Sequence, residues 1–231
     1  MKVLIAVDLQ NDFIDGALGT PEASAILPAA LRRIREFDGP VLFTRDTHGP
    51  DYPQTREGRV LPVPHCIAGT DGWQIAPSLQ PYAAEIIDKP TFGSTSLGER
   101  LQAMNAQHPI ESITLIGLCT DICVISNALL LRAFLPEVPI TVDAACCAGV
   151  TPQSHRIALQ AMRACQIEIE NPPDCLFHLL CAGAQSARRA FRPLPKPPRR
   201  RRARPSGGRP CGPSSGTQPP PLQITQRKCP P

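Results

Sequence analysis

Short apolar runs rich in valine and isoleucine recur along the chain as far as Asn171, and longer stretches with helical spacing separate them. Most of the runs are apolar on both faces, which is typical of buried parallel strands. Because such strands alternate with helices, the sequence predicts an α/β fold: a doubly wound, mostly parallel six-stranded sheet flanked by helices. The six runs are Val3–Val7, Val41–Phe43, Glu85–Ile87, Ile113–Ile116, Ile140–Val142 and Ile167–Ile169.

Three of the stretches between the runs carry clear helix signals. Ala23–Phe37 has apolar residues at helical spacing, and Thr151–Cys165 opens with a threonine N-cap followed by proline at the first helical position. Asp121–Phe134 is apolar almost throughout, so we expect that helix to be largely buried. Residues 46 to 82 lack such signals and are predicted to form long loops, which are usually functional in a compact domain.

The composition changes abruptly after Asn171. Residues 172–231 hold fourteen of the 28 prolines and twelve of the 24 lysines and arginines, but one of the 20 acidic residues. The other twelve basic and 19 acidic residues give residues 1–171 a net charge of −7, against +11 for residues 172–231. This split predicts one globular domain over residues 1–171 and a disordered Pro/Arg-rich tail over residues 172–231.

Three interpretations of the tail stay open. The first is an electrostatic arm for nucleic acid or a membrane surface, built on the run Arg199–Arg202. The second is a solvated tail without a specific role, and the third is out-of-frame translation. We favour the second or third over the first, so nucleic acid is not an expected partner.

The ten cysteines form no C-x-x-C pair, so neither a zinc ribbon nor a dithiol redox motif is predicted. The first apolar run is interrupted by Asp8 and is too short for a signal peptide. No run approaches the roughly 20 apolar residues that span a bilayer. We therefore expect a reduced, cytoplasmic protein without a membrane partner.

Chemically useful side chains follow four of the predicted strands. Asp8 follows the first, Asp46 and His48 follow the second, Lys89 follows the third, and the segment Cys119–Cys123 follows the fourth. In an open parallel sheet, ligands bind beyond the carboxyl ends of the strands. We therefore expect a carboxylate, a metal-type pair, an amine and a thiol to meet at one edge of the sheet.

Cys123 stands near the start of the predicted helix over residues 121–134. The free amides and dipole of a helix N-terminus lower the pKa of a thiol, and a nearby Lys89 ammonium acts in the same direction. Asp8 is then the group that takes the thiol proton and returns it to a leaving amine. Two structural interpretations stay open: Cys123 as a small core residue, and Asp8 with Lys89 as a structural ion pair.

Three motifs carry a family resemblance. They are Val-Asp-Leu-Gln-Asn-Asp-Phe at residues 7–13, Asp-Lys-Pro-Thr-Phe-Gly-Ser at residues 88–94, and Gly-Leu-Cys-Thr-Asp-Ile-Cys-Val at residues 117–124. In order and spacing they resemble the isochorismatase-like cysteine hydrolases, in particular the nicotinamidase/pyrazinamidase-like branch. The resemblance covers nearly all of residues 1–170 and implies the Rossmann-like fold of that family and a homo-oligomer.

By this resemblance Asp8, Lys89 and Cys123 are the catalytic residues, and the Cys123 thiolate attacks the substrate carbonyl. The resemblance also implies a cis peptide between Leu118 and Cys119. The backbone amides of Cys119 and Cys123 then form the oxyanion hole, where two donors stabilise the developing charge.

A second constellation consists of Asp46-x-His48, Glu57 and a Pro-His-Cys motif that contains His65. Histidine and carboxylate side chains suit zinc, iron or manganese, and Asp46 and His48 project from the same side of an extended segment. The resemblance implies that Asp46, His48 and His65 hold a divalent metal that fixes a ring nitrogen of the substrate. Glu57 is our candidate for the fourth ligand, and Cys66 is left unliganded. Loop residues that cap turns are the alternative interpretation.

The substrate wall departs from the family pattern. Nicotinamidases often carry an aromatic residue just ahead of Pro-His-Cys, whereas here residues 60–64 read Val-Leu-Pro-Val-Pro. Phe13 and Leu118 are the residues that we predict to contact the substrate, while Trp73 cannot be placed from the sequence. The resemblance to a hydrolase is therefore closer than the resemblance to an enzyme for nicotinamide.

The sequence thus predicts a cysteine hydrolase that cleaves a small amide, nicotinamide first among them as in NAD salvage, through a thioester on Cys123. One alternative is a metal-free relative that acts on another small amide, a ureide or a vinyl ether, and the metal-ligand set argues against it. An alternative of another class is a non-catalytic binding protein with a basic tail that attracts nucleic acid. The intact catalytic set argues against that one.

Overall fold

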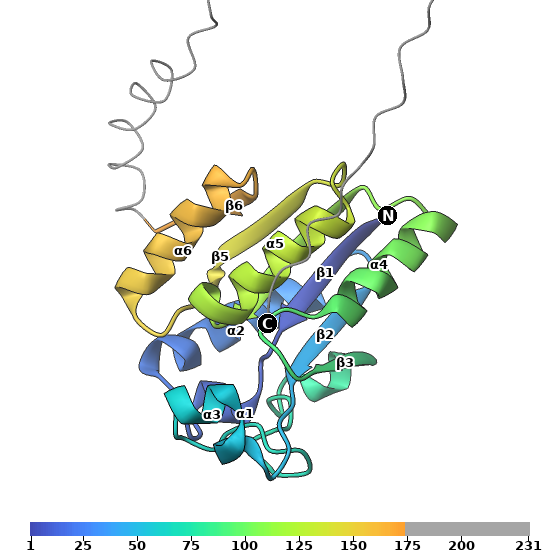
Figure 1. Ribbon diagram of the computed structural model, residues 1–231. Helices are drawn as coiled ribbons and strands as arrows, with labels where there is room; N and C mark the ends of the chain where they lie inside the picture. The colour runs from blue at the N-terminus through green and yellow to red at the C-terminus, as the bar shows by residue number, and fades with distance from the viewer. Residues whose placement is uncertain (174–231) are drawn as a thin grey trace, which may run out of the picture. The chain divides into compact units, whose positions relative to one another are not determined.

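The structure is a computed structural model that describes residues 1–173. It confirms the predicted α/β fold, with six strands in one sheet that all pair in parallel in the order β3-β2-β1-β4-β5-β6 (Figure 1). The strands are β1 (Lys2–Val7), β2 (Val41–Asp46), β3 (Glu85–Lys89), β4 (Ser112–Leu118), β5 (Ile140–Ala148) and β6 (Glu168–Glu170). The predicted tail, with its possible role as a basic arm, lies outside the described residues except for Pro172 and Pro173.

Two layers of helices cover the sheet. The longer helices are α2 (Pro21–Arg35), α4 (Thr95–Gln107), α5 (Ile125–Phe134) and α6 (Pro152–Ala164). The shorter ones are α1 (Asn11–Ile14), α3 (Arg56–Val60) and three single turns, η1 (Tyr52–Gln54), η2 (Gln80–Tyr82) and η3 (Thr120–Val124). Helices α4, α5 and α6 lie together on one face and α2 lies on the other, as Figure 1 shows.

The pattern of β1 explains this layering. Alternate residues of a strand point to opposite faces, so Val3, Ile5 and Val7 join the core under α4, α5 and α6, while Leu4 and Ala6 join the core under α2. All five side chains are fully buried. A strand that is apolar on both faces therefore forms the middle of the sheet, where both faces need cover.

Several elements extend beyond their predicted limits. β2 and β3 run on to Asp46 and Lys89, so these two residues close their strands and pair with each other in the register instead of following the strands. The long helix α4 was not predicted, because its apolar positions are sparse among polar ones. The loops between residues 46 and 82 contain the short helices η1, α3 and η2.

The prediction of a largely buried helix over residues 121–134 is correct for one face of the helix and wrong for the other. The helix is split into the π-turn η3 and the α-helix α5, and Leu129 on its outer face is 40% exposed. A helix in a surface layer covers the sheet with one face and leaves the other to solvent. The described residues contain no helix with the length and hydropathy of a membrane span.

The strand order reverses between β1 and β4. In sheets of this kind ligands bind beyond the carboxyl ends of the strands at such a reversal. Asp8 follows β1 and the segment that contains Cys123 follows β4, so these two residues flank the reversal. The short helices α1 and α3 gather at the same end of the sheet (Figure 1).

Candidate active site and metal centre

Three strand ends place a charged group at each of three neighbouring positions. Asp46 and Lys89 are partners in the β2–β3 register, and the residue after β1 is Asp8, whose N–H donates to the Thr44 carbonyl of β2 at 3.2 Å. The Thr44 hydroxyl also donates to Asp8 Oδ1 at 2.6 Å. The sheet register therefore sets the relative positions of the two carboxylates and the amine.

Lys89 is the centre of this group. Its side chain is 1% exposed, and Nζ lies 2.7 Å from Asp8 Oδ2, 3.1 Å from Asp46 Oδ1 and 3.5 Å from Cys123 Sγ. Burial alone lowers the pKa of an amine, but Asp8, Cys123 and Asp46 together raise the pKa of Lys89 above its ordinary value. Lys89 is therefore an ammonium ion that contacts all three of the other groups.

Asp8 occupies a strained backbone position, with φ of 47°. A non-glycine residue in the left-handed region is uncommon, although aspartate tolerates it better than most. The carboxylate is fully buried, and burial raises its pKa above the usual range while the Lys89 charge acts in the opposite direction. A carboxyl with a raised pKa is suited to accept and return a proton near neutral pH.

Cys123 lies in η3 with its side chain almost fully buried. Burial, followed by the charge of Asp8, raises the pKa of the Cys123 thiol well above its ordinary value, although Lys89 lowers it. The sequence predicts a depressed thiol pKa from the helix N-terminus, whereas burial of the sulfur, with Asp8 beside it, acts in the opposite direction. Asp8 therefore lies where it can accept the thiol proton as the sulfur reacts.

The segment that carries Cys123 is held from several sides. Gly117 has φ of +117°, and a Cβ there would lie 2.0 Å from the Val7 carbonyl oxygen, so only glycine allows β4 to approach β1 at this point. The peptide between Leu118 and Cys119 is cis, as the resemblance implied. The Thr120 hydroxyl lies 2.8 Å from Nδ1 of His155 on α6.

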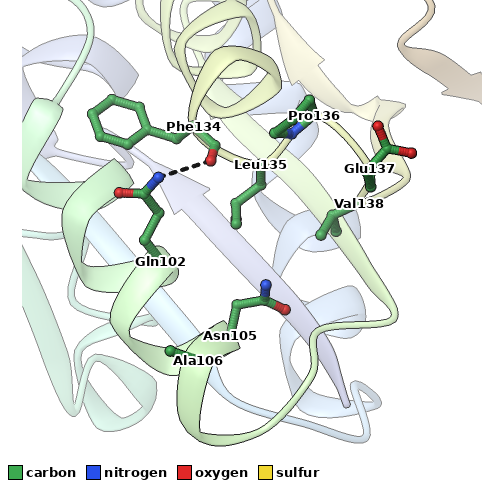
Figure 2. Close-up of a pocket in the computed structure, with 8 residues that line it drawn as sticks. All are labelled: Gln102, Asn105, Ala106, Phe134, Leu135, Pro136, Glu137 and Val138. Atoms are coloured by element: carbon green, nitrogen blue, oxygen red, sulfur yellow. Dashed lines mark hydrogen bonds between the residues drawn. The ribbon is translucent and has the colours of Figure 1, made fainter.

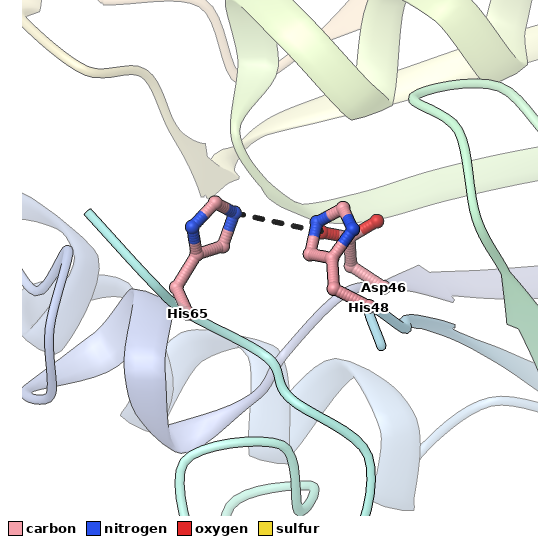
Figure 3. A group of neighbouring side chains, drawn as sticks. All are labelled: Asp46, His48 and His65. Atoms are coloured by element: carbon pink, nitrogen blue, oxygen red, sulfur yellow. Dashed lines mark ion pairs between the residues drawn. The ribbon is translucent and has the colours of Figure 1, made fainter. Parts of the chain in front are cut away.

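The second predicted constellation also assembles. Asp46, His48 and His65 are buried and offer ligand atoms that all lie within 4.8 Å of one another, and Figure 3 shows the three side chains turned toward a common point. Asp46 Oδ2 lies 2.9 Å from His48 Nε2 and 3.8 Å from His65 Nε2. Two imidazoles and a carboxylate form a ligand set that suits a divalent transition metal.

The hydrogen bonding of the two histidines fits such an ion. Nδ1 of His65 lies 2.8 Å from the Val63 carbonyl, which only accepts hydrogen bonds, so Nδ1 is the donor and Nε2 is the ring atom that faces Asp46. His48 Nε2 is buried and makes no hydrogen bond of suitable geometry. A cation at this point would also offset the net negative charge of the neighbouring carboxylates.

Glu57 lies at the edge of the group. Its Oε1 is 3.8 Å from His48 Nε2 and 3.7 Å from His65 Nε2, and the side chain is 23% exposed. Helix α3 carries Glu57 and is capped by Thr55, whose hydroxyl accepts the Gly58 N–H at 2.9 Å. Glu57 therefore lies beside the group of Asp46, His48 and His65 but outside its closest contacts, and its role as fourth ligand stays a prediction.

Two buried residues that support this centre were not singled out from the sequence. Gln10 pairs with the Asp46 backbone in both directions: Oε1 accepts the Asp46 N–H at 2.7 Å, and Nε2 donates to the Asp46 carbonyl at 2.9 Å. The Tyr52 ring is fully buried, with its centroid 4.7 Å from that of His48 and 5.0 Å from that of His65. Gln10 lies within the first motif and was open to detection, whereas nothing in the sequence marks Tyr52.

The residues predicted to contact substrate are mostly covered. The Phe13 ring centroid lies 5.6 Å from that of His65, and the side chain keeps a small exposed area. Leu118 is 1% exposed and packs in the core under α2. The Trp73 ring is covered by the Arg45 guanidinium, 3.4 Å from its centroid, and its Nε1–H donates to Thr47, so its position is set by these contacts.

Two surface cavities lie apart from these groups. One, of about 360 Å³, sits between the C-terminal ends of α4 and α5, where the Gln102 amide donates to the Phe134 carbonyl (Figure 2). It is at the amino end of β5, opposite the strand ends that carry the reactive groups. The other, of about 270 Å³, lies beside the first turn of α6 and includes His155 and Cys147.

Comparison with known proteins agrees with this geometry. The family model of the isochorismatase domain matches residues 2–171. The chain belongs to the isochorismatase family. It is 28% identical over 192 residues to a nicotinamidase/pyrazinamidase of Mycobacterium tuberculosis, which covers 73% of this chain and 98% of the relative. It is 30% identical over 171 residues to an uncharacterized isochorismatase family protein of Bacillus subtilis, which covers 68% of this chain and 92% of that relative.

A solved structure extends the comparison to the metal centre. The pyrazinamidase of Pyrococcus horikoshii in complex with zinc superposes with a TM-score of 0.63 at 28% identity, over 73% of this chain and 97% of that one. These relatives confirm the nicotinamidase-like branch of the family and the predicted class of amidohydrolase. The zinc complex and the group of Asp46, His48 and His65 together fit a divalent metal.

Proposed function

We propose that this member of the isochorismatase family hydrolyses a small aromatic amide, nicotinamide first, to the carboxylate and ammonia. The observation that carries the proposal is the contact of Lys89 with both Cys123 and Asp8, directly beside a ligand set for a metal. Relatives named as nicotinamidases of Mycobacterium tuberculosis and Escherichia coli support nicotinamide as the first substrate to test.

The chemistry begins with the Cys123 thiol. Asp8 takes the thiol proton as the sulfur attacks the amide carbonyl, and Lys89 stabilises the sulfur while the negative charge moves. The backbone amides of Cys119 and Cys123 are proposed as donors to the oxyanion, each of which contributes a few kcal/mol (about 3–4) of barrier lowering in comparable sites. The C–N bond then breaks, Asp8 returns the proton to the nitrogen, and ammonia leaves a thioester on Cys123.

The second half of the reaction uses the same groups. Asp8 takes a proton from water as the water oxygen attacks the thioester carbonyl. The C–S bond breaks, the acid product departs, and Asp8 returns the proton to the Cys123 sulfur. A single carboxyl therefore acts twice as base and twice as acid, which its raised pKa favours.

Asp46, His48 and His65, with Glu57 as fourth ligand, are proposed to hold the divalent ion. When bound, such an ion would act as a Lewis acid toward a ring nitrogen of the substrate and so favour an orientation with the amide near Cys123. The zinc complex of the Pyrococcus relative makes zinc the first ion to test, before iron and manganese. Phe13, beside His65, is proposed as one wall for the substrate ring.

A second substrate class is supported by the few aromatic side chains available for a substrate ring. Tyr52 is fully buried and Trp73 is held by Arg45 and Thr47, which leaves Phe13, beside His65 and 8% exposed. An N-carbamoylsarcosine amidase of Thermoplasma acidophilum is a structural neighbour at 26% identity with a TM-score of 0.58. Non-aromatic amides and ureides are therefore the next substrates to test.

The test measures ammonia released from nicotinamide, benzamide and N-carbamoylsarcosine by the full chain. Cys123→Ala and chelation should each abolish release from nicotinamide, while Cys165→Ala, at an exposed cysteine, should leave it unchanged. Benzamide lacks the ring nitrogen and should be a poor substrate. Release that survives Cys123→Ala would overturn the proposed nucleophile.

Light scattering of the same samples tests the expected homo-oligomer.

A further inference from the structure

Asn127 is a fully buried polar residue in the otherwise apolar helix α5. It lies one helical turn after Cys123 and faces the core side of that helix. An asparagine amide that is buried without partners is unfavourable by about 1–3 kcal/mol, so its contacts need an account.

The Asn127 side chain uses both its donor and its acceptor side. Nδ2 donates to the Cys123 carbonyl at 2.9 Å and to the Phe92 carbonyl at 3.1 Å. Oδ1 accepts the Ser94 N–H at 2.9 Å. One side chain therefore bonds the backbone of the residue proposed as nucleophile and two backbone groups of the segment that follows Lys89.

This segment, residues 90–94, packs closely on α5. A Cβ at Gly93 would lie 2.4 Å from Cδ1 of Leu130 and 3.3 Å from the Ser126 carbonyl, so glycine permits the approach. Ser94 then caps α4, since its hydroxyl accepts the Leu97 N–H at 3.1 Å. The segment is thus fixed at its far end by α4, along its length by α5 and at its start by the strand that ends in Lys89.

We propose that Asn127 is a positioning residue for the reaction, which holds the loop after Lys89 and the backbone of Cys123 at a fixed separation. This inference rests on the proposed function, in which the Lys89 ammonium acts on the Cys123 sulfur. The contact of 3.5 Å between Nζ and Sγ joins two elements that are distant in the sequence. Asn127 hydrogen-bonds the Cys123 carbonyl in η3 and, on the other side, the loop that directly follows the strand of Lys89. A displacement of about 1 Å between reacting groups can slow an enzyme by about 100-fold.

An amide side chain is needed here because it both donates and accepts hydrogen bonds. Leucine has a similar size but makes no hydrogen bond, and aspartate keeps an acceptor for the Ser94 N–H but as a carboxylate cannot donate to the two carbonyls. Neither replacement removes a group that touches substrate. Asn105 provides a matched control, because its Oδ1 accepts the Ile110 N–H at 2.7 Å at the end of α4, away from Cys123.

The experiment compares Asn127→Leu, Asn127→Asp and Asn105→Leu in the full chain. Two quantities are measured: kcat and KM for the amide, and the rate at which iodoacetamide alkylates Cys123, followed by peptide mass spectrometry across pH 6 to 9. We expect both Asn127 variants to lose about 10–100-fold in kcat with KM within about 2-fold, and to alkylate Cys123 more slowly with a shifted pH profile. Asn105→Leu should lower the melting temperature without either effect.

The outcomes separate this inference from the proposed function. If the wild type hydrolyses no amide in a Cys123-dependent way, the proposed function fails, and the alkylation profiles still test Asn127. If the alkylation profile and kcat of a folded Asn127 variant equal those of the wild type, the inference is wrong. Should Asn127→Leu not fold, Asn127→Asp, which keeps the size and the acceptor, decides between these results.

Discussion

Asp46 Oδ1 lies 3.1 Å from Lys89 Nζ, and this contact joins the candidate metal centre to the candidate nucleophile site. The other oxygen of the same carboxylate lies 2.9 Å from His48 Nε2. One side chain thus belongs to both groups, and a change in either is transmitted to the other through a single carboxylate.

Replacement of Asp46 should therefore weaken metal binding as well as remove a partner of Lys89. Asp46→Asn keeps the shape but removes the charge, and we expect metal affinity to fall by at least about 10–100-fold, the range seen even for outer-shell partners. Calorimetric titration of zinc into the metal-free protein measures this. Asp88→Asn is the control, since Asp88 is half exposed on β3 and pairs with Arg45 on β2, one position before Asp46 and Lys89. Equal zinc affinity in both variants would contradict the assigned ligand.

Lys89→Met should destabilise the fold as well as stop the reaction. It leaves Asp8 and Asp46 buried without their cation, and breaking a buried pair from one side costs about 3–5 kcal/mol. The loss of kcat should be about 100-fold or more. Urea unfolding and ammonia release measure the two effects. Lys2→Met, at an exposed lysine of β1, should change neither, and a stable Lys89→Met would show that the carboxylates are neutral.

Tyr52 should control the geometry of the two histidines without touching substrate. Tyr52→Leu removes the ring that packs on His48 and His65, and we expect zinc affinity to fall by about 10–100-fold. Tyr52→Phe keeps the ring and loses the 2.9 Å hydrogen bond to the Leu61 carbonyl, so its loss should be smaller. Titration with zinc ranks the affinities of the variants, and Tyr82→Phe, at a partly exposed tyrosine, is the control. An unchanged affinity in Tyr52→Leu would remove Tyr52 from this role.

The pairing of His155 with Thr120 predicts a pH dependence of stability. Burial lowers the pKa of His155 below its ordinary value of 6.5. The unfolded chain therefore binds the proton first, so the stability from this residue is complete above pH 6.5 and is lost as the pH falls through the folded-state pKa. Urea midpoints between pH 7.5 and 5 should fall less in His155→Gln than in the wild type. His108→Gln, at an exposed histidine, should follow the wild type, and parallel curves for all three would contradict the assignment.

Gly117 offers a comparison of two glycines with positive φ. Gly117→Ala places a Cβ 2.0 Å from the Val7 carbonyl oxygen. We therefore expect the free energy of unfolding to fall by more than about 3 kcal/mol and the activity to be lost. Gly69, with φ of +84°, has no atom within 4 Å of the added Cβ. Gly69→Ala should then cost only the backbone strain of about 1–2 kcal/mol. Equal losses in urea unfolding would mean that conformation alone, and not the approach of β4 to β1, requires glycine.

The sequence predicts the inner strands of the sheet well because they are apolar on both faces. Each of the six predicted runs overlaps a strand, although the edge strands β3 and β6 carry exposed residues on one face. The helix α4 escaped detection because its polar residues dilute the helical pattern. The positions of Asp8, Asp46, Lys89 and Cys123 also followed from the rule that ligands bind at strand ends.

Two of the supporting residues were beyond such rules. Tyr52 and Asn127 act through contacts with other segments of the chain that no local pattern reports, whereas Gln10 lies in a motif that the sequence shows. The thiol pKa was also misjudged, because a helix N-terminus is visible in the sequence while full burial beside Asp8 is not. Local patterns place the reactive groups, whereas their environment depends on the tertiary structure.

The anchor between Thr120 and His155 has a consequence for synthesis on the ribosome, where a chain emerges from its N-terminus. Every side chain proposed as reactive or as a metal ligand is translated by residue 124, but α6 begins only at Pro152. A nascent chain that has emerged as far as β5 would carry the full set of groups with the loop around Cys123 still unanchored. The thiol would be in place before the contact that holds its loop, so the loop around Cys123 would be anchored only when α6, the last helix of the described residues, docks.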